Sequence, residues 1–176
     1  RDRASGQSFV VQPTSPTEVE FVATDVPSMG YRSYDLIPGP PSSVERTDST
    51  QIANEFYSVR VRPSDGAIIS VVDRKLGHEL VPSGQALNEL LRWVPQENLS
   101  VGMDRVTSEI ESGPVFTRLR TRRPGTLWPE TDIKLYRGIR RVAIANQLDR
   151  DRMPFVASNQ VGEYYSFNFP LAFTTP

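Results

Sequence analysis

Apolar and polar residues alternate in short runs along most of this chain, and turn-forming residues separate the runs. Alternation with a period of two places successive side chains on opposite faces of an extended strand. Runs that follow this rule or nearly follow it, or that read as short strands between turn residues, lie at residues 18–24, 31–36, 56–62, 67–73, 78–81, 105–110, 115–122, 132–136, 141–148 and 164–173. We therefore predict an all-β fold, an antiparallel β-sandwich or barrel with about eight or more strands.

The clearest hairpin in the sequence is centred on Asp65 and Gly66. Runs rich in β-branched residues at 56–62 and 67–73 flank the turn residues. An Asp-Gly pair favours a turn because glycine adopts positive φ values without steric cost. We predict that the two runs pair as neighbouring antiparallel strands.

Composition divides the chain into three parts. Residues 38–50 are rich in proline and serine and predict a linker, because proline removes backbone donors and does not suit a central strand. This linker separates residues 1–37 from residues 51–176. Within the larger part, residues 86–94 remain ambiguous, because the spacing of their leucines fits a short helix and an irregular strand equally.

Charge and composition narrow the classes of partner. The 20 basic and 21 acidic residues give a net charge of −1, and no apolar stretch is long enough to span a bilayer. We therefore expect neither nucleic acid nor a membrane as a partner. Nearly all basic residues are Arg, which is typical of a GC-rich bacterial source, and we expect a bacterial, cytoplasmic protein.

The sequence offers little catalytic chemistry. It has no cysteine and one histidine, His78, which follows a turn glycine, so it predicts no zinc site and no catalytic triad. Glycine-rich phosphate-binding motifs are also absent. Pairs of carboxylates at i, i+2 could work as acid and base on one strand face, or could be solvated strand ends. These pairs are Asp149 with Asp151, Glu109 with Glu111, and Glu130 with Asp132.

Three arginines form a second candidate surface. Arg118, Arg120 and Arg122 fall on one face of the run at 115–122. Such a row is either a solvated sheet face or a surface that docks an acidic domain.

Exposed aromatic residues would form a third candidate surface, because they stack on sugar rings. The candidates are Trp93, Trp128 and Tyr164. The alternative is that each packs in a core or against a neighbouring proline.

Several sequence segments, taken in order, resemble segments of glycoside hydrolase family 38, the α-mannosidases. They cover nearly the whole chain: residues 1–7 (Arg-Asp-Arg-Ala-Ser-Gly-Gln), 26–34 (Val-Pro-Ser-Met-Gly-Tyr-Arg-Ser-Tyr), 54–59 (Asn-Glu-Phe-Tyr-Ser-Val), 65–81 (from Asp-Gly-Ala-Ile to His-Glu-Leu-Val), 112–115 (Ser-Gly-Pro-Val), 135–138 (Leu-Tyr-Arg-Gly) and 163–170 (Glu-Tyr-Tyr-Ser-Phe-Asn-Phe-Pro). Each segment alone is only a strand-turn-strand pattern. Their shared order is what carries the resemblance.

The resemblance implies a non-catalytic C-terminal region of a hydrolase that removes terminal α-mannosides in mannose and glycan catabolism. Residues 1–37 would be the end strands of a small β-sandwich, and residues 51–176 would begin a galactose-mutarotase-like supersandwich, left incomplete. The parent's zinc ion and catalytic residues would lie in a catalytic domain outside this sequence. The chain would support that domain and frame its carbohydrate site, and an incomplete sandwich could also self-associate.

Other functions remain open. The chain could be a stand-alone carbohydrate-binding module or a purely structural β-sandwich module. A sugar epimerase of the mutarotase type is a weaker alternative, because that chemistry needs an acid and base pair and the chain has only His78.

Overall fold

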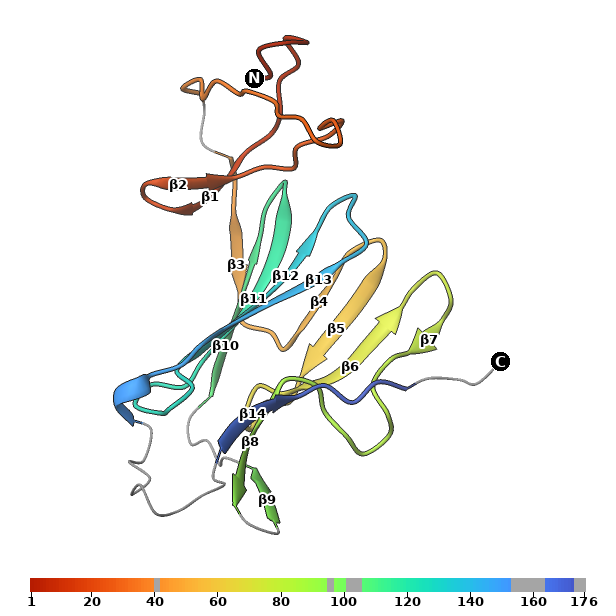
Figure 1. The fold of residues 1–176 in the computed structure, drawn as a ribbon, viewed down its shortest axis with the longest axis vertical. Helices are drawn as coiled ribbons and strands as arrows, with labels where there is room; N and C mark the ends of the chain where they lie inside the picture. The colour runs from red at the N-terminus through yellow and green to blue at the C-terminus, as the bar shows by residue number, and fades with distance from the viewer. Residues whose placement is uncertain (40–41, 95–96, 101–105, 153–163, 173–176) are drawn as a thin grey trace.

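The computed structural model describes residues 1–39, 42–94, 97–100, 106–152 and 164–172. Figure 1 shows that these residues form antiparallel β-sheets, with one short 3-10 helix at Arg150–Arg152. The all-β antiparallel fold predicted from the sequence is confirmed. Among the described residues, none belongs to a helix long and apolar enough to cross a membrane.

The two largest sheets pack against each other as a sandwich. The five-stranded sheet has the order β13-β12-β11-β10-β3, with β3 at Glu45–Thr47, β10 at Thr107–Ser112, β11 at Phe116–Arg122, β12 at Glu130–Tyr136 and β13 at Val142–Gln147. The four-stranded sheet has the order β4-β5-β6-β7, with β4 at Gln51–Ala53, β5 at Tyr57–Val61, β6 at Ile68–Asp73 and β7 at His78–Glu79.

The main core lies between these two sheets. Val59 and Val61 of β5 are fully buried, as are Leu119 of β11 and Ile133 of β12. Alternate residues of the central strands β5, β11 and β12 point into this core, which is why the period-two pattern identified these strands.

A three-stranded sheet, in the order β14-β8-β9, covers a second and smaller core. Its strands are β8 at Glu89–Val94, β9 at Glu97–Ser100 and β14 at Tyr164–Asn168. The ambiguous segment 86–94 is thus largely a strand. Leu90 points toward Leu127 and Trp128, and the pairing with β14 supplies the backbone hydrogen bonds.

The Asp-Gly hairpin is confirmed. β5 and β6 pair antiparallel up to Val61 and Ile68, and Gly66 has φ of 76°. The Arg62 side chain bonds the Asp65 carboxylate, and the Arg62 amide donates to the Ala67 carbonyl at 2.7 Å. The connection is therefore a six-residue loop, closed by the Arg62–Asp65 ion pair and by the backbone hydrogen bond between Arg62 and Ala67, with positive φ at Gly66 alone.

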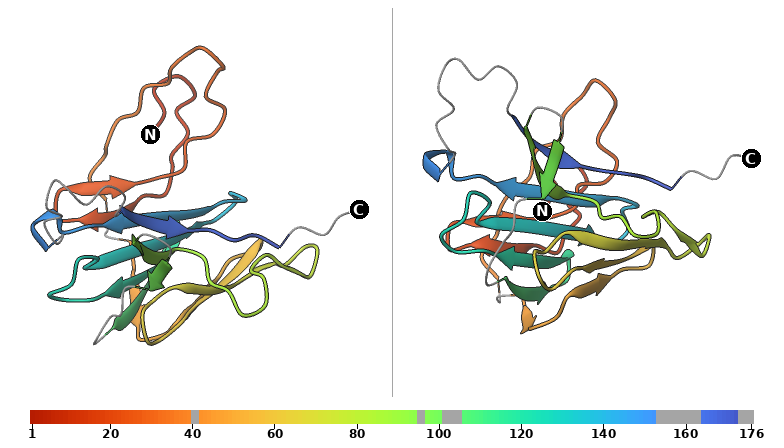
Figure 2. Two further views of the ribbon diagram at one scale, coloured as in Figure 1. Left: turned by 60° about the horizontal axis from the view of Figure 1, so that its bottom comes forward. Right: turned by 90° about the horizontal axis from the view of Figure 1, so that it is seen from below.

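One strand predicted in the N-terminal part does not form. Residues 1–37, red to orange in Figures 1 and 2, extend from one end of the sandwich and contain only the hairpin of β1, Gln12–Ser15, and β2, Glu18–Glu20. The predicted strand at 31–36 is wrong, because only Tyr34 makes a bridge, to Asp2. The Tyr34 ring packs against Phe9 and Phe21 instead.

The segment predicted as linker also contains a strand. β3, within residues 38–50, pairs with β10 at the edge of the five-stranded sheet. Its three residues are all exposed, and an edge position tolerates the polar sequence Glu-Arg-Thr.

Candidate functional site

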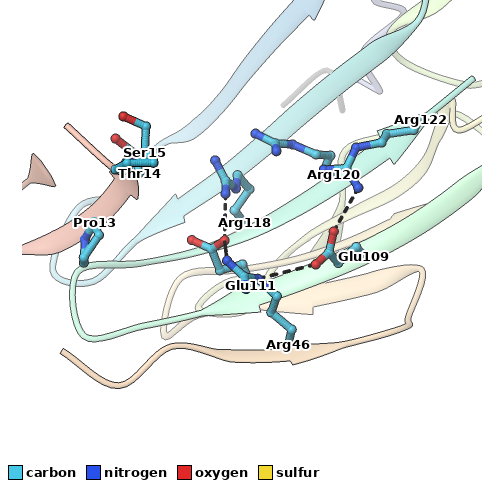
Figure 3. Close-up of a pocket in the computed structure, with 10 residues that line it drawn as sticks. Pro13, Thr14, Ser15, Arg46, Glu109, Glu111, Arg118, Arg120 and Arg122 are labelled. Atoms are coloured by element: carbon cyan, nitrogen blue, oxygen red, sulfur yellow. Dashed lines mark hydrogen bonds and ion pairs between the residues drawn. The ribbon is translucent and has the colours of Figure 1, made fainter. Parts of the chain in front are cut away.

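A groove runs between the β1–β2 hairpin and the outer face of the five-stranded sheet. It has a volume of about 390 Å³, which lies within the range of small-molecule sites. Residues 13–16 of the hairpin form one wall, and six charged side chains form the floor (Figure 3). These side chains are Arg46, Glu109, Glu111, Arg118, Arg120 and Arg122.

The register of the strands places opposite charges side by side on this floor. Arg118 and Arg120 of β11 lie directly opposite Glu111 and Glu109 of β10, while Asp132 of β12 flanks Arg120 on the other side. Rows of positive and negative charge therefore alternate from strand to strand. Cross-strand pairs of opposite charge stabilise a sheet.

The ion pairs on the floor are close and partly buried. Arg118 Nη2 lies 2.7 Å from Glu111 Oε2, and both side chains are less than 10% exposed. Arg120 donates from Nε and Nη2 to both carboxylate oxygens of Asp132, at 2.7 and 2.9 Å. The hydrogen bond to Asp132 raises the pKa of Arg120, although burial works against it. Arg122 bonds Glu109 and Glu130.

These pairs connect two sets of residues that sequence analysis treated separately. The arginine row is compensated by Glu109, Glu111, Glu130 and Asp132, so it presents no bare positive face. Four of the six carboxylates considered as acid and base are thus partners of the arginine row on β11. The remaining pair lies elsewhere, and Asp149 there bonds Arg152 of the same turn at 3.0 Å.

The hairpin wall is anchored at both of its strands. The fully buried Gln12 accepts hydrogen bonds from the amides of Val115 and Phe116, at 3.1 and 3.0 Å. Glu20 accepts from the Tyr136 hydroxyl at 2.8 Å and pairs with Lys134. Burial, together with the bond to Glu20, raises the pKa of Tyr136 to about 12. The groove is therefore held open by fixed contacts.

Trp128 is a core residue, not a surface residue. Its indole is 1% exposed, packs edge-to-face on Phe167, and donates to Asn146 Oδ1 at 3.1 Å. The guanidinium of Arg123 lies 3.7 Å from the ring centroid. A sugar finds no free face on this indole, so the prediction that Trp128 stacks on carbohydrate is corrected.

Trp93 and Tyr164 come together on the outer face of the three-stranded sheet. They are direct cross-strand partners on β8 and β14, and their rings stack with centroids 5.1 Å apart and an interplanar angle of 12°. Tyr164 is 53% exposed and Trp93 is partly buried. They point away from Leu90 and Phe167, which face the second core.

A buried polar network joins the sheets behind the groove. Asn146 Oδ1 accepts hydrogen bonds from Asn88, Trp128 and Thr131, and Arg123 donates to Thr131 and to the Asp65 carbonyl. Burial lowers the pKa of Arg123 to about 10, against the opposing effect of Asp65. Asn88 has φ of 57°.

Sequence analysis missed this network and the hairpin wall. Single Asn and Thr residues carry no signal in a sequence, and the contact between Gln12 and Val115 joins positions 103 residues apart. His78 lies in β7 opposite Asp73. No group of three or more His, Cys, Asp or Glu side chains able to hold a metal ion occurs in the described part of the chain.

Comparison of the chain with protein-family models, with curated proteins and with solved structures found no match in any of the three.

Proposed function

We propose that this chain is a non-catalytic β-domain region of a family 38 α-mannosidase-like glycoside hydrolase. It supports the catalytic domain of the same parent chain and frames a site for mannosides. The sequence segments that occur in the same order as in that family suggest this assignment, and the antiparallel sandwich is compatible with it. The parent's zinc and its catalytic residues belong to the catalytic domain, and this chain supplies none of them.

The observation that carries the supporting role is the apolar surface of residues 1–37. Seven of the twelve large apolar side chains that are exposed among the described residues lie in this part. They are Val10, Val19, Val26, Met29, Tyr31, Leu36 and Ile37, with Met29 and Tyr31 the most exposed. A concentration of exposed apolar side chains marks an interaction surface. In this proposal the catalytic domain of the parent covers it.

Hydroxyl-radical footprinting of the isolated chain and of the full-length parent tests this role. Met29 and Tyr31 react readily and are exposed here, so both are labelled in the isolated chain and protected in the parent. The buried Trp128 is the internal reference and stays unlabelled in both. Equal labelling of Met29 and Tyr31 in the two proteins contradicts the proposed packing.

A second candidate function is carbohydrate binding at the Trp93–Tyr164 stack. The exposed Tyr164 ring, stacked on Trp93, offers an apolar aromatic face, which suits the C–H face of a pyranose ring. Titration with mannobiose should change the tryptophan fluorescence saturably, since Trp93 touches Tyr164. Tyr164→Ala should remove the response, whereas Tyr31→Ala, another exposed tyrosine, should preserve it. A flat titration of the unmodified chain removes this candidate.

A further inference from the structure

The groove beneath the β1–β2 hairpin is preformed and polar. Its floor is the set of charged side chains on β3, β10 and β11, and its wall is the hairpin that Gln12 and Glu20 fasten to the sheet. Figure 3 shows the guanidinium groups of Arg118 and Arg120 on the side of the floor that faces Thr14 and Ser15. A site fixed in this way loses little conformational entropy when it binds a ligand.

The charged side chains of the floor are four arginines and two glutamates, and Glu130 and Asp132 of the neighbouring strand β12 pair with these arginines, so that the whole set of ion pairs carries no net charge. Four arginines and four carboxylates form these ion pairs: Arg46, Arg118, Arg120 and Arg122 with Glu109, Glu111, Glu130 and Asp132. An anion would lie near Glu109 and Glu111, and a cation would lie near the arginines. The balance of charge therefore favours a neutral ligand over an ion of either sign.

Hydrogen-bonding capacity remains after the ion pairs have formed. An arginine has five N–H donors, and Arg120 uses only Nε and Nη2 toward Asp132, at 2.7 and 2.9 Å. Arg118 is held in place by Glu111 and is 8% exposed, so its orientation is fixed. Carboxylate oxygens have several acceptor positions each, and Glu109 is one-third exposed.

Donors and acceptors thus alternate at the spacing of neighbouring strands, about 5 Å. A ligand that matches this pattern needs groups that both donate and accept, which describes hydroxyl groups. Pro13 and Pro16 supply C–H surface on the opposite wall, where Thr14 and Ser15 add two hydroxyls. From these features we infer that the groove binds a neutral polyhydroxylated molecule of about monosaccharide size.

This inference rests on the groove alone and holds whether or not the parent is a mannosidase. It also concerns a surface different from the Trp93–Tyr164 stack, because the groove lies on the five-stranded sheet and the stack on the three-stranded sheet. The two sites are therefore separable by experiment.

The test is a titration of the isotope-labelled chain, followed by the backbone amide NMR signals. The probes are myo-inositol, methyl α-mannoside and inorganic phosphate. We expect saturable shifts at Thr14, Arg118 and Arg120 with at least one neutral probe. The dissociation constant should change by less than about twofold between low and physiological salt, since no net charge is screened. Absence of saturable shifts with both neutral probes, or binding of phosphate that weakens steeply with salt, overturns the inference.

Two tryptophan substitutions on the hairpin locate the binding. Thr14→Trp fills the groove without removing an ion pair, and should weaken binding by about tenfold or more. Thr17→Trp places the same ring on the exposed turn outside the groove lining, and should bind as the unmodified chain does. Unchanged binding by Thr14→Trp contradicts the assignment. Tyr164→Ala leaves the groove intact, and loss of the shifts in that variant would also contradict it.

Discussion

Asn146 is the side chain on which the buried polar contacts converge. Its Oδ1 accepts from Asn88, Trp128 and Thr131 at 2.9 to 3.1 Å. Truncation leaves buried donors without an acceptor, and each such group costs about 1–3 kcal/mol. We expect Asn146→Ala to lower the free energy of unfolding by about 2–4 kcal/mol in urea denaturation.

The neighbouring position supplies the matched control. Gln147 is on the same strand and is exposed, so Gln147→Ala should change the free energy of unfolding by less than about 0.5 kcal/mol. Similar losses in the two variants would show that the network does not hold the sheets together.

Asp73 makes stability depend on pH. Burial alone would raise its pKa, but the bond from Arg140 and those from the amides of Leu76 and Lys75 outweigh burial, so its pKa is lowered. A carboxyl whose pKa is lower in the folded state stabilises the fold above its unfolded pKa, about 3.9, and that contribution disappears as the pH falls through the folded pKa.

We therefore expect the urea midpoint to fall as the pH is lowered below about 4, and to fall less in Asp73→Asn. Arg140→Gln should give an intermediate result, because the two backbone bonds remain. An identical acid dependence in Asp73→Asn and the unmodified chain would remove Asp73 as a contributor.

At the scale of elements, two turns of the four-stranded sheet contain glycines with similar backbone angles and different surroundings. Gly66 and Gly77 have φ of 76° and 64°. A Cβ at Gly77 meets no atom within 4 Å, whereas a Cβ at Gly66 would collide with the Arg123 guanidinium. Alanine at either position costs about 1–2 kcal/mol for the left-handed conformation.

Gly66→Ala should therefore lower the thermal midpoint clearly more than Gly77→Ala does. The difference between the two variants measures the packing of Arg123 against the β5–β6 hairpin. Equal losses in the two variants would mean that Arg123 moves aside at no cost.

The β1–β2 hairpin is held on the sandwich by Gln12 of β1 and by Glu20 of β2. Gln12→Ala removes the acceptor of the Val115 and Phe116 amides. We therefore expect the free energy that holds the hairpin on the sheet to fall by about 1–3 kcal/mol, and hydrogen exchange at β1 and β2 to become faster. Amides of β5 and β6 should exchange as before, because they lie in the other sheet. Unchanged exchange at the hairpin would show that Glu20 alone anchors it.

Local patterns predicted the strands better than their partners. The alternation at 115–122 predicted β11 and the shared face of its arginines, because side-chain direction follows from position along one strand. It did not predict that Glu111 meets Arg118, because strand pairing is a contact between distant parts of the chain. Residues 31–36 also read as a short strand between turn residues, and they form no strand because no neighbouring strand pairs with them.

The candidate sites show the same limit. Trp93 and Tyr164 were both predicted as surface aromatics, but only the pairing of β8 with β14 brings them together. Trp128 has the same sequence signal and is buried, because Asn146 and Arg123 supply its polar partners inside the fold. A single aromatic residue does not reveal which of these two environments it will occupy.

At the scale of the whole molecule, polar and apolar surfaces are separated. The outer face of the five-stranded sheet is charged and internally compensated, whereas residues 1–37 carry seven of the twelve large apolar side chains that are exposed among the described residues. The charged face suits contact with water or a small polar ligand. The apolar part suits contact with a protein domain, as the proposed role in a larger hydrolase requires.

The most direct test of that role is the activity of the full-length parent on p-nitrophenyl α-mannoside, with and without a zinc chelator, beside this chain under the same conditions. The account predicts turnover by the parent, loss of turnover with the chelator, and no turnover by the chain alone. A parent that is inactive on α-mannosides, or a chain that hydrolyses the substrate by itself, contradicts it.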